Sequence, residues 1–184
     1  GLDGKFVALF GGNLGKGQRI ENIAYLAEYY IDKTDIVFLI IAKGVEKDKL
    51  HQIADEKKLI NIRFMDFMSQ KDYLNLTKTV NLGLVSINEN YRVPTCPSKA
   101  VSYMAAGVPI FAIINPGSDY GQIIEDCGAG YWTVGSDKKR TVELFDILYK
   151  DSELRQRMCK DGRAFYEKNC TVEAAYETMI SQMK

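Results

Sequence analysis

Short, almost wholly apolar runs alternate along this chain with longer segments in which apolar residues recur every three or four positions. The clearest run, residues 36–41, contains no polar side chain. Such a run suits a strand that is buried on both faces of a parallel sheet covered by helices. Strands that alternate with helices through right-handed crossovers form a doubly wound domain. We therefore predict an α/β fold with a doubly wound parallel sheet of about six strands.

The expected elements keep this alternating order until about residue 135, after which only helical patterns remain. The predicted strands are residues 6–10, 36–41, 61–65, 82–87, 110–114 and 131–134. The predicted helices are 18–31, 47–58, one that opens with a capping box at 69–72, 98 to about 107, 120–127, 141–149, 152–168 and 172–183. The last three are extra C-terminal helices beyond the doubly wound unit.

Composition excludes several classes of protein. The 184 residues suit a single domain, 1–184, and Lys plus Arg balance Asp plus Glu at 24 each, so no net field attracts nucleic acid. Four separated cysteines and one histidine, His51, do not have the spacing of a zinc site. The longest apolar run is too short to cross a bilayer, and we expect a cytoplasmic protein with reduced thiols. Because the chain opens without Met, we expect a piece of a longer protein.

Three predicted loops collect at the carboxyl ends of the strands, where doubly wound sheets bind ligands: residues 11–18, 66–69 and 88–98. The first loop has glycines at 11, 12, 15 and 17, and Lys16 and Arg19 supply cations beside the next helix. This spacing is neither G-x-G-x-x-G nor the phosphate-binding G-x-x-x-x-G-K-[ST]. The loop is either a surface that a ligand approaches closely or a tight strand-to-helix turn.

The segment from Pro94 to Pro109 predicts a rigid loop, a short helix and a turn into a core strand. Ser98 is the expected N-cap, and Gly107 lies where the helix is expected to end. A helix N-terminus that faces such a loop points N–H groups and positive dipole at a ligand, which suits a phosphate. The alternative is a short packing helix without a ligand.

These segments together resemble the C-terminal, nucleotide-sugar-binding domain of GT-B-fold retaining glycosyltransferases, in particular the bacterial polysaccharide-synthesis type (glycosyl transferases group 1). The resemblance extends over the whole chain. The most specific motifs are PSK at 97–99 and YMAAGVP at 103–109, and GNLGKGQ at 12–18, NIRF at 61–64 and CGAG at 127–130 support them.

The resemblance implies a division of labour among named residues. The sugar donor's diphosphate is expected at Gly12, Asn13, Lys16, Arg19, Ser98 and Lys99. Its ribose and base are expected at Phe67, Met68 and Ser102. The resemblance also implies a UDP- or GDP-linked sugar as substrate, no metal or other cofactor, and catalysis that is mostly electrostatic. Catalytic residues stay unassigned.

The same resemblance implies an N-terminal acceptor domain, absent from these residues, that takes a saccharide or lipid-linked saccharide. The full-length protein is then cytoplasmic or peripheral at the inner face of the plasma membrane. The isolated domain is expected to be inactive.

Four positions depart from the pattern of many relatives. Asn13 and Gln18 stand where those relatives carry Arg and Lys, and Pro94 and Ser102 stand where they carry glutamates. Glu89 is a candidate substitute for the first glutamate. These departures keep a second reading open, a catalytically inactive nucleotide-sugar-binding module. A third reading, a dinucleotide-binding domain, lacks both the fingerprint and the ribose carboxylate.

Overall fold

The computed structural model describes residues 1–92 and 96–182, and in these residues one sheet of six parallel strands forms the centre of the molecule. The strand order is β3-β2-β1-β4-β5-β6, the order of a doubly wound sheet, which confirms the predicted fold class. The strands are β1 (Phe6–Asn13), β2 (Ile36–Lys43), β3 (Ile62–Phe64), β4 (Leu82–Ser86), β5 (Ile110–Ile113) and β6 (Gly130–Thr133).

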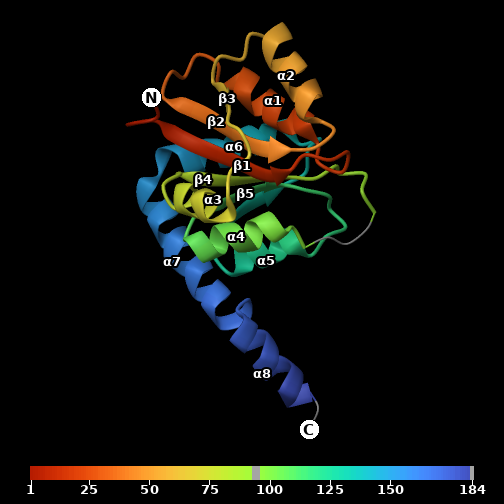
Figure 1. Cartoon of the computed structure of the whole chain (residues 1–184), viewed down its shortest axis with the longest axis vertical. Helices are drawn as coiled ribbons and strands as arrows, with labels where there is room; N and C mark the ends of the chain where they lie inside the picture. Colours follow the sequence, from red (N-terminus) through yellow and green to blue (C-terminus); the bar gives the residue numbers. More distant parts are fainter. Residues whose placement is uncertain (93–95, 183–184) are drawn as a thin grey trace.

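Eight helices in the described part of the chain cover the sheet and extend from it. They are α1 (Ile20–Tyr29), α2 (Lys47–Glu56), α3 (Gln70–Thr77), α4 (Ser98–Ala106), α5 (Tyr120–Asp126), α6 (Lys138–Lys150), α7 (Ser152–Asn169) and α8 (Val172–Gln182). In Figure 1, α1 and α2 lie on one side of the sheet and α3, α4 and α5 lie on the other. Figure 1 also shows α8 running away from the body of the molecule toward the C-terminus.

Each face of the sheet has its own hydrophobic core, because alternate residues of a strand point to opposite faces. On β1, Phe6, Ala8 and Phe10 pack with α1, α2 and α6, whereas Val7 and Leu9 pack with α4 and α5. Both sets are buried. This two-sided burial is the physical reason for the continuous apolar runs in the sequence.

The predicted helix boundaries at α3 and α4 show which local signals were sufficient. The predicted N-cap at α3 is present, since the Ser69 hydroxyl accepts the Asp72 N–H at 3.2 Å; the hydroxyl also donates to the Asp72 carboxylate at 2.6 Å. Gly107 follows α4 in the left-handed conformation with φ 67°, as a helix C-cap requires. The predicted N-cap at Ser98 is wrong, because Pro97 holds the cap position and Ser98 is already helical. Pro97 and Ser98 are adjacent and both are common at the start of a helix, so the sequence left that register open to a one-residue shift.

The main difference from the prediction is the length of β1. The strand does not end at the first glycine but pairs with β2 through Gly11, Gly12 and Asn13. Glycine keeps its backbone hydrogen bonds in a strand, so a glycine pair alone does not end one. Two predicted features, Pro94 in the glutamate position and the end of the last helix at Met183, lie outside the described residues.

No helix in residues 1–92 and 96–182 is both long and apolar enough to cross a membrane.

Candidate functional site

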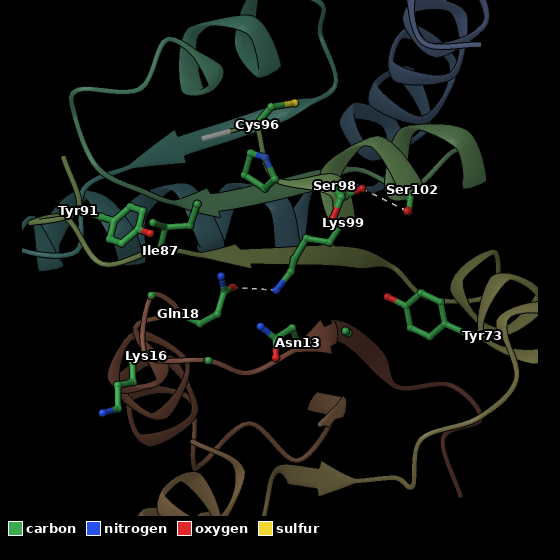
Figure 2. Close-up of a pocket in the computed structure, with 15 residues that line it drawn as sticks. Asn13, Lys16, Gln18, Tyr73, Ile87, Tyr91, Cys96, Ser98, Lys99 and Ser102 are labelled. Atoms are coloured by element: carbon green, nitrogen blue, oxygen red, sulfur yellow. Dashed lines mark hydrogen bonds between the residues drawn. The ribbon is translucent and has the colours of Figure 1, made fainter. Parts of the chain in front are cut away.

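A cavity of about 630 Å³ opens at the carboxyl end of the sheet. It lies where β1 and β4 are neighbours and their connections leave toward opposite flanks, the point at which doubly wound sheets bind ligands. The end of β1 and the β1–α1 loop form one wall, and the first turn of α4 forms the other (Figure 2). The lining residues are Gly11, Gly12, Asn13, Gly15, Lys16, Gly17, Gln18, Tyr73, Ile87, Tyr91, Cys96, Pro97, Ser98, Lys99 and Ser102.

Two glycines at the end of β1 give this cavity a bare backbone wall. Gly11 has no room for a side chain, because the ring and hydroxyl of Tyr73 occupy the place of a Cβ. Gly12 has φ 95°, a conformation that other residues rarely adopt, and the space where its Cβ would lie is open. The backbone at Gly12 is therefore accessible to a ligand at van der Waals distance.

Lys99 brings the most unusual charge to the cavity. Its Nζ donates to the Gln18 side-chain oxygen at 2.8 Å and lies 3.6 Å from the centre of the Phe10 ring. Burial lowers the pKa of the Lys99 ammonium to about 7. The dashed line in Figure 2 joins Lys99, which comes from α4, to Gln18, which comes from the β1–α1 loop. The two residues thus meet across the cavity, although 81 positions separate them in sequence.

The other predicted cations lie differently. Lys16 lines the rim of the cavity but is exposed, and Figure 2 shows its ammonium directed away from the interior. Arg19 does not line this cavity; it lies 3.5 Å from the Glu21 carboxylate beside a separate small pocket. Glu89 lies beside that same pocket, and its carboxylate accepts the Ser136 N–H at 2.8 Å, which lowers the pKa of Glu89.

Ser98 in the first turn of α4 and Ser102 one turn further on both line the cavity. The Ser102 hydroxyl donates to the Ser98 carbonyl oxygen at 3.2 Å, an internal bond one turn back along the helix. The first N–H groups of a helix have no acceptor inside it, so this end of α4 directs donors outward. The start of α4, with its unpaired N–H groups, and the side chain of Lys99 thus both border the cavity.

An adjoining cavity of about 440 Å³ shares Gly12 and Tyr73 with the first one. Phe67 and Met68, the predicted base-binding residues, line it. The Phe67 side chain is 58% exposed, and the Lys43 ammonium lies 4.3 Å from the centre of its ring. The cavity with the predicted base-binding residues Phe67 and Met68 thus adjoins the cavity with the predicted diphosphate-binding residues, and Tyr73 lines both.

Tyr73 and Tyr103 shape the site and were not predicted. The Tyr103 hydroxyl donates to the Leu9 carbonyl oxygen at 3.0 Å and accepts the Gly11 N–H at 3.4 Å, and it is fully buried. The Tyr103 ring occupies the place of a Cβ on Gly83 in β4. Glycine inside a buried strand marks a close approach by another group, so Gly11 and Gly83 were the sequence signal for these two tyrosines.

The charge and shape of the cavity suit an anion that is approached by backbone. None of its described lining residues is an Asp or a Glu, whereas Lys16 and Lys99 are cationic. Among residues 1–92 and 96–182, no group of three or more histidine, cysteine or acidic side chains is arranged to hold a metal ion. The molecule is thus a doubly wound α/β domain with a cavity that suits an anion at its switch point and a more apolar cavity beside it.

Comparison with known proteins assigns this domain to a family. The model of the family glycosyl transferases group 1 matches residues 2–165, and the chain belongs to that family. This membership confirms the resemblance to glycosyl transferases group 1 that the sequence motifs indicated. A relative in Escherichia coli K12, WcaI, which is named as a colanic acid biosynthesis glycosyl transferase, is 27% identical over 123 residues, 67% of this chain and 30% of its own length. The chain spans about a third of the length of the curated relatives it matches.

Solved structures share the fold. The C-terminal domain of a glycosyl transferase group 1 family protein, LpcC from Francisella tularensis, superimposes with a TM-score of 0.70 at 19% identity, covering 90% of this chain and 86% of that domain. Anabaena HepE, solved in complex with UDP and glucose, gives a TM-score of 0.77 at 15% identity and covers 99% of this chain and 49% of its own. At these identities the likeness establishes the GT-B half-domain fold.

Proposed function

We propose that the chain is the donor-binding half of a glycosyltransferase that moves a sugar from a nucleotide-sugar to an acceptor in cell-surface polysaccharide or lipopolysaccharide synthesis. The observation that carries this proposal is the position of the Lys99 ammonium in a cavity between Gly12 and the first turn of α4. No Asp or Glu among the described residues lines this cavity. Family membership favours a transferase over an inactive binding module. The name of WcaI supports the polysaccharide context, and the UDP bound by HepE supports a nucleotide-linked donor.

The nucleotide-sugar is proposed to lie across both cavities. Its diphosphate lies between Gly12 and the N-terminus of α4, where Lys99 supplies charge and backbone N–H groups donate. Its base lies in the adjoining cavity against Phe67 and Met68. The ribose then lies near Tyr73, which is common to both cavities.

This arrangement performs electrostatic catalysis of bond cleavage. As the sugar leaves the diphosphate, negative charge builds up on the phosphate oxygens, and fixed donors that face those oxygens stabilise the transition state. We assign that role to Lys99 and to the N–H groups at the start of α4, and the proposal includes no metal. Asn13 and Lys16 are proposed to contact the outer phosphate from the rim.

The acceptor is proposed to bind to a second domain of the full-length protein, on the cytoplasmic side of the membrane or at its inner surface. A saccharide or lipid-linked saccharide fits the family context.

Calorimetric titration of the purified chain with UDP, GDP and NAD tests the proposal. Binding of UDP or GDP, with NAD much weaker, is the expected result. NAD binding without binding of either nucleoside diphosphate would indicate a dinucleotide-binding domain and overturn the proposal.

A further inference from the structure

Lys99 has an unusual set of neighbours for a half-buried ammonium. Its Nζ donates to the Gln18 oxygen at 2.8 Å and faces the Phe10 ring at 3.6 Å. No Asp or Glu lines the cavity in the described chain. Buried charges in proteins are ordinarily paired with an opposite charge, and this one has an amide oxygen and an aromatic face instead.

The amide partner leaves the charge of Lys99 available. An ammonium has three N–H donors, of which the Gln18 oxygen accepts one. A neutral acceptor orients the ammonium without cancelling its charge. Within residues 1–92 and 96–182 no second hydrogen-bond acceptor of this ammonium is found, so its remaining donors can serve an anion that enters the cavity between Gly12 and α4.

We propose that Gln18 is a positioning residue: its neutral amide oxygen holds the Lys99 ammonium in the cavity and leaves the positive charge available to the donor diphosphate. This inference rests on the proposed function. Gln18 belongs to the β1–α1 loop and Lys99 belongs to α4, so their contact also fixes the distance between the two walls of the cavity. When the diphosphate binds, its oxygens complete the set of acceptors around the ammonium.

Two changes at position 18 separate this role from a merely structural one. A carboxylate at this place pairs with Lys99 and competes with the diphosphate for its charge. A side chain without an acceptor removes the hydrogen bond that favours the charged ammonium. The pKa of Lys99, which burial already lowers to about 7, should then fall further.

Other titratable groups around the cavity do not reproduce these effects. They are Lys16 from the β1–α1 loop, Tyr73 from α3, and Tyr91 and Cys96 from the segment between β4 and α4. The Lys16 ammonium points away from the interior in Figure 2. The lowered pKa of Lys99 has one cause, its desolvation, and none of these groups contributes to it.

The experiment measures UDP-glucose binding by calorimetry at about pH 6 and about pH 8, with wild type, Gln18→Glu and Gln18→Met. UDP-glucose is the probe because its diphosphate, unlike a terminal phosphate with a pKa near 6, does not titrate in this range. Protonated Lys99 becomes more abundant as the pH falls through about 7, so the wild type should bind more tightly at the lower pH. Gln18→Glu should weaken binding about tenfold or more at both pH values. Gln18→Met should weaken it about tenfold at the higher pH and recover at the lower pH.

Gln122→Glu provides the matched control. Gln122 is exposed on α5 and does not line the cavity, so the same change of charge there should leave binding unaltered. If Gln122→Glu and Gln18→Glu weaken UDP-glucose binding equally, the loss of affinity comes from the net charge of the protein alone, and the inference is overturned. Gln18→Met that binds like the wild type at both pH values would overturn it as well.

A second readout keeps the inference separate from the proposed function. NMR titration of the Lys99 side chain without nucleotide should show its pKa rising in Gln18→Glu and falling in Gln18→Met. If the wild type binds neither UDP-glucose, UDP nor GDP, the proposed function fails, whereas this titration still tests the pairing. An unchanged Lys99 pKa in both variants would show that Gln18 does not control the ammonium.

Discussion

At the scale of single residues, Gly12 joins two properties that make it indispensable to the proposed site. Its φ of 95° suits glycine alone, and the space above its Cα is open to the cavity. A side chain there would both strain the backbone and stand where the diphosphate is proposed to lie. The same residue also borders the adjoining cavity, so a nucleotide that lies across both cavities, as proposed, would pass it.

Gly12→Val should therefore abolish nucleotide binding and leave a folded protein. Gly4→Val is the matched control, because Gly4 also has a positive φ, of 71°, and open space around it but does not line either cavity. Calorimetry with UDP and GDP measures binding, and circular dichroism checks the fold of both variants. Undiminished binding by a folded Gly12→Val protein would exclude this site.

Ser102 raises a different question, since relatives of this type commonly carry a glutamate at its position. The hydroxyl lines the cavity but donates to the Ser98 carbonyl, so it offers a ligand little more than its lone pairs. A carboxylate there would accept hydrogen bonds from both ribose hydroxyls. Ser102→Glu should thus tighten nucleotide binding by about 1–3 kcal/mol, the worth of hydrogen bonds to a charged group.

Calorimetry with a ribonucleotide and with its 2′,3′-dideoxy analogue measures that gain, which should vanish for the analogue. The glutamine of Ser102→Gln has nearly the same size as the glutamate of Ser102→Glu but no charge, so this variant should gain less binding affinity. A Ser102→Glu variant that binds more weakly than wild type would mean that other groups hold the ribose, and Tyr73, which lines both cavities, is one candidate.

At the scale of elements, α3 begins at the loop that carries the proposed base-binding residues. Its N-cap, Ser69, bonds the Asp72 N–H and carboxylate, and Ser69 also lines the adjoining cavity. Ser69→Ala should lower the free energy of unfolding by about 1 kcal/mol, the usual worth of a helix N-cap. Ser69→Thr, which keeps the hydroxyl, should retain most of it. Urea denaturation of the three proteins measures the difference, and equal stability of all three would contradict this role of the cap.

Elements were easier to predict than the directions of side chains. The apolar runs at β2 and β5 and the cap signals at Ser69 and Gly107 act over a few residues, so their consequences are visible in the sequence. The surroundings of the Arg19 side chain are not local, since the small pocket that it lines also includes Glu89 and Ser136 from distant segments. The meeting of Gln18 with Lys99 depends on strand order, because β1 and β4 become neighbours only in the folded sheet.

At the scale of the whole molecule, the position of the cavity at one end of the sheet bears on what the domain can do alone. It lies at the carboxyl end of the sheet, and the chain corresponds to 49% of HepE and about a third of its curated relatives. A glycosyl transfer needs an acceptor in contact with the sugar and the exclusion of water, which would otherwise react in its place.

The 184 residues alone should accordingly bind a nucleoside diphosphate and transfer no sugar. On α8, Val172, Tyr176 and Met179 are 82%, 62% and 60% exposed at a helical spacing that places them along one side, an apolar face that could pack against another domain. Incubation with UDP-glucose and lipid-linked or free saccharide acceptors, followed by assay of released UDP, measures both transfer and hydrolysis. The full-length protein, assayed in parallel, shows whether the acceptors are suitable. Sugar transfer by the isolated chain at a rate comparable to the full-length protein would mean that this domain contains its own acceptor site, and the division into two halves would be wrong.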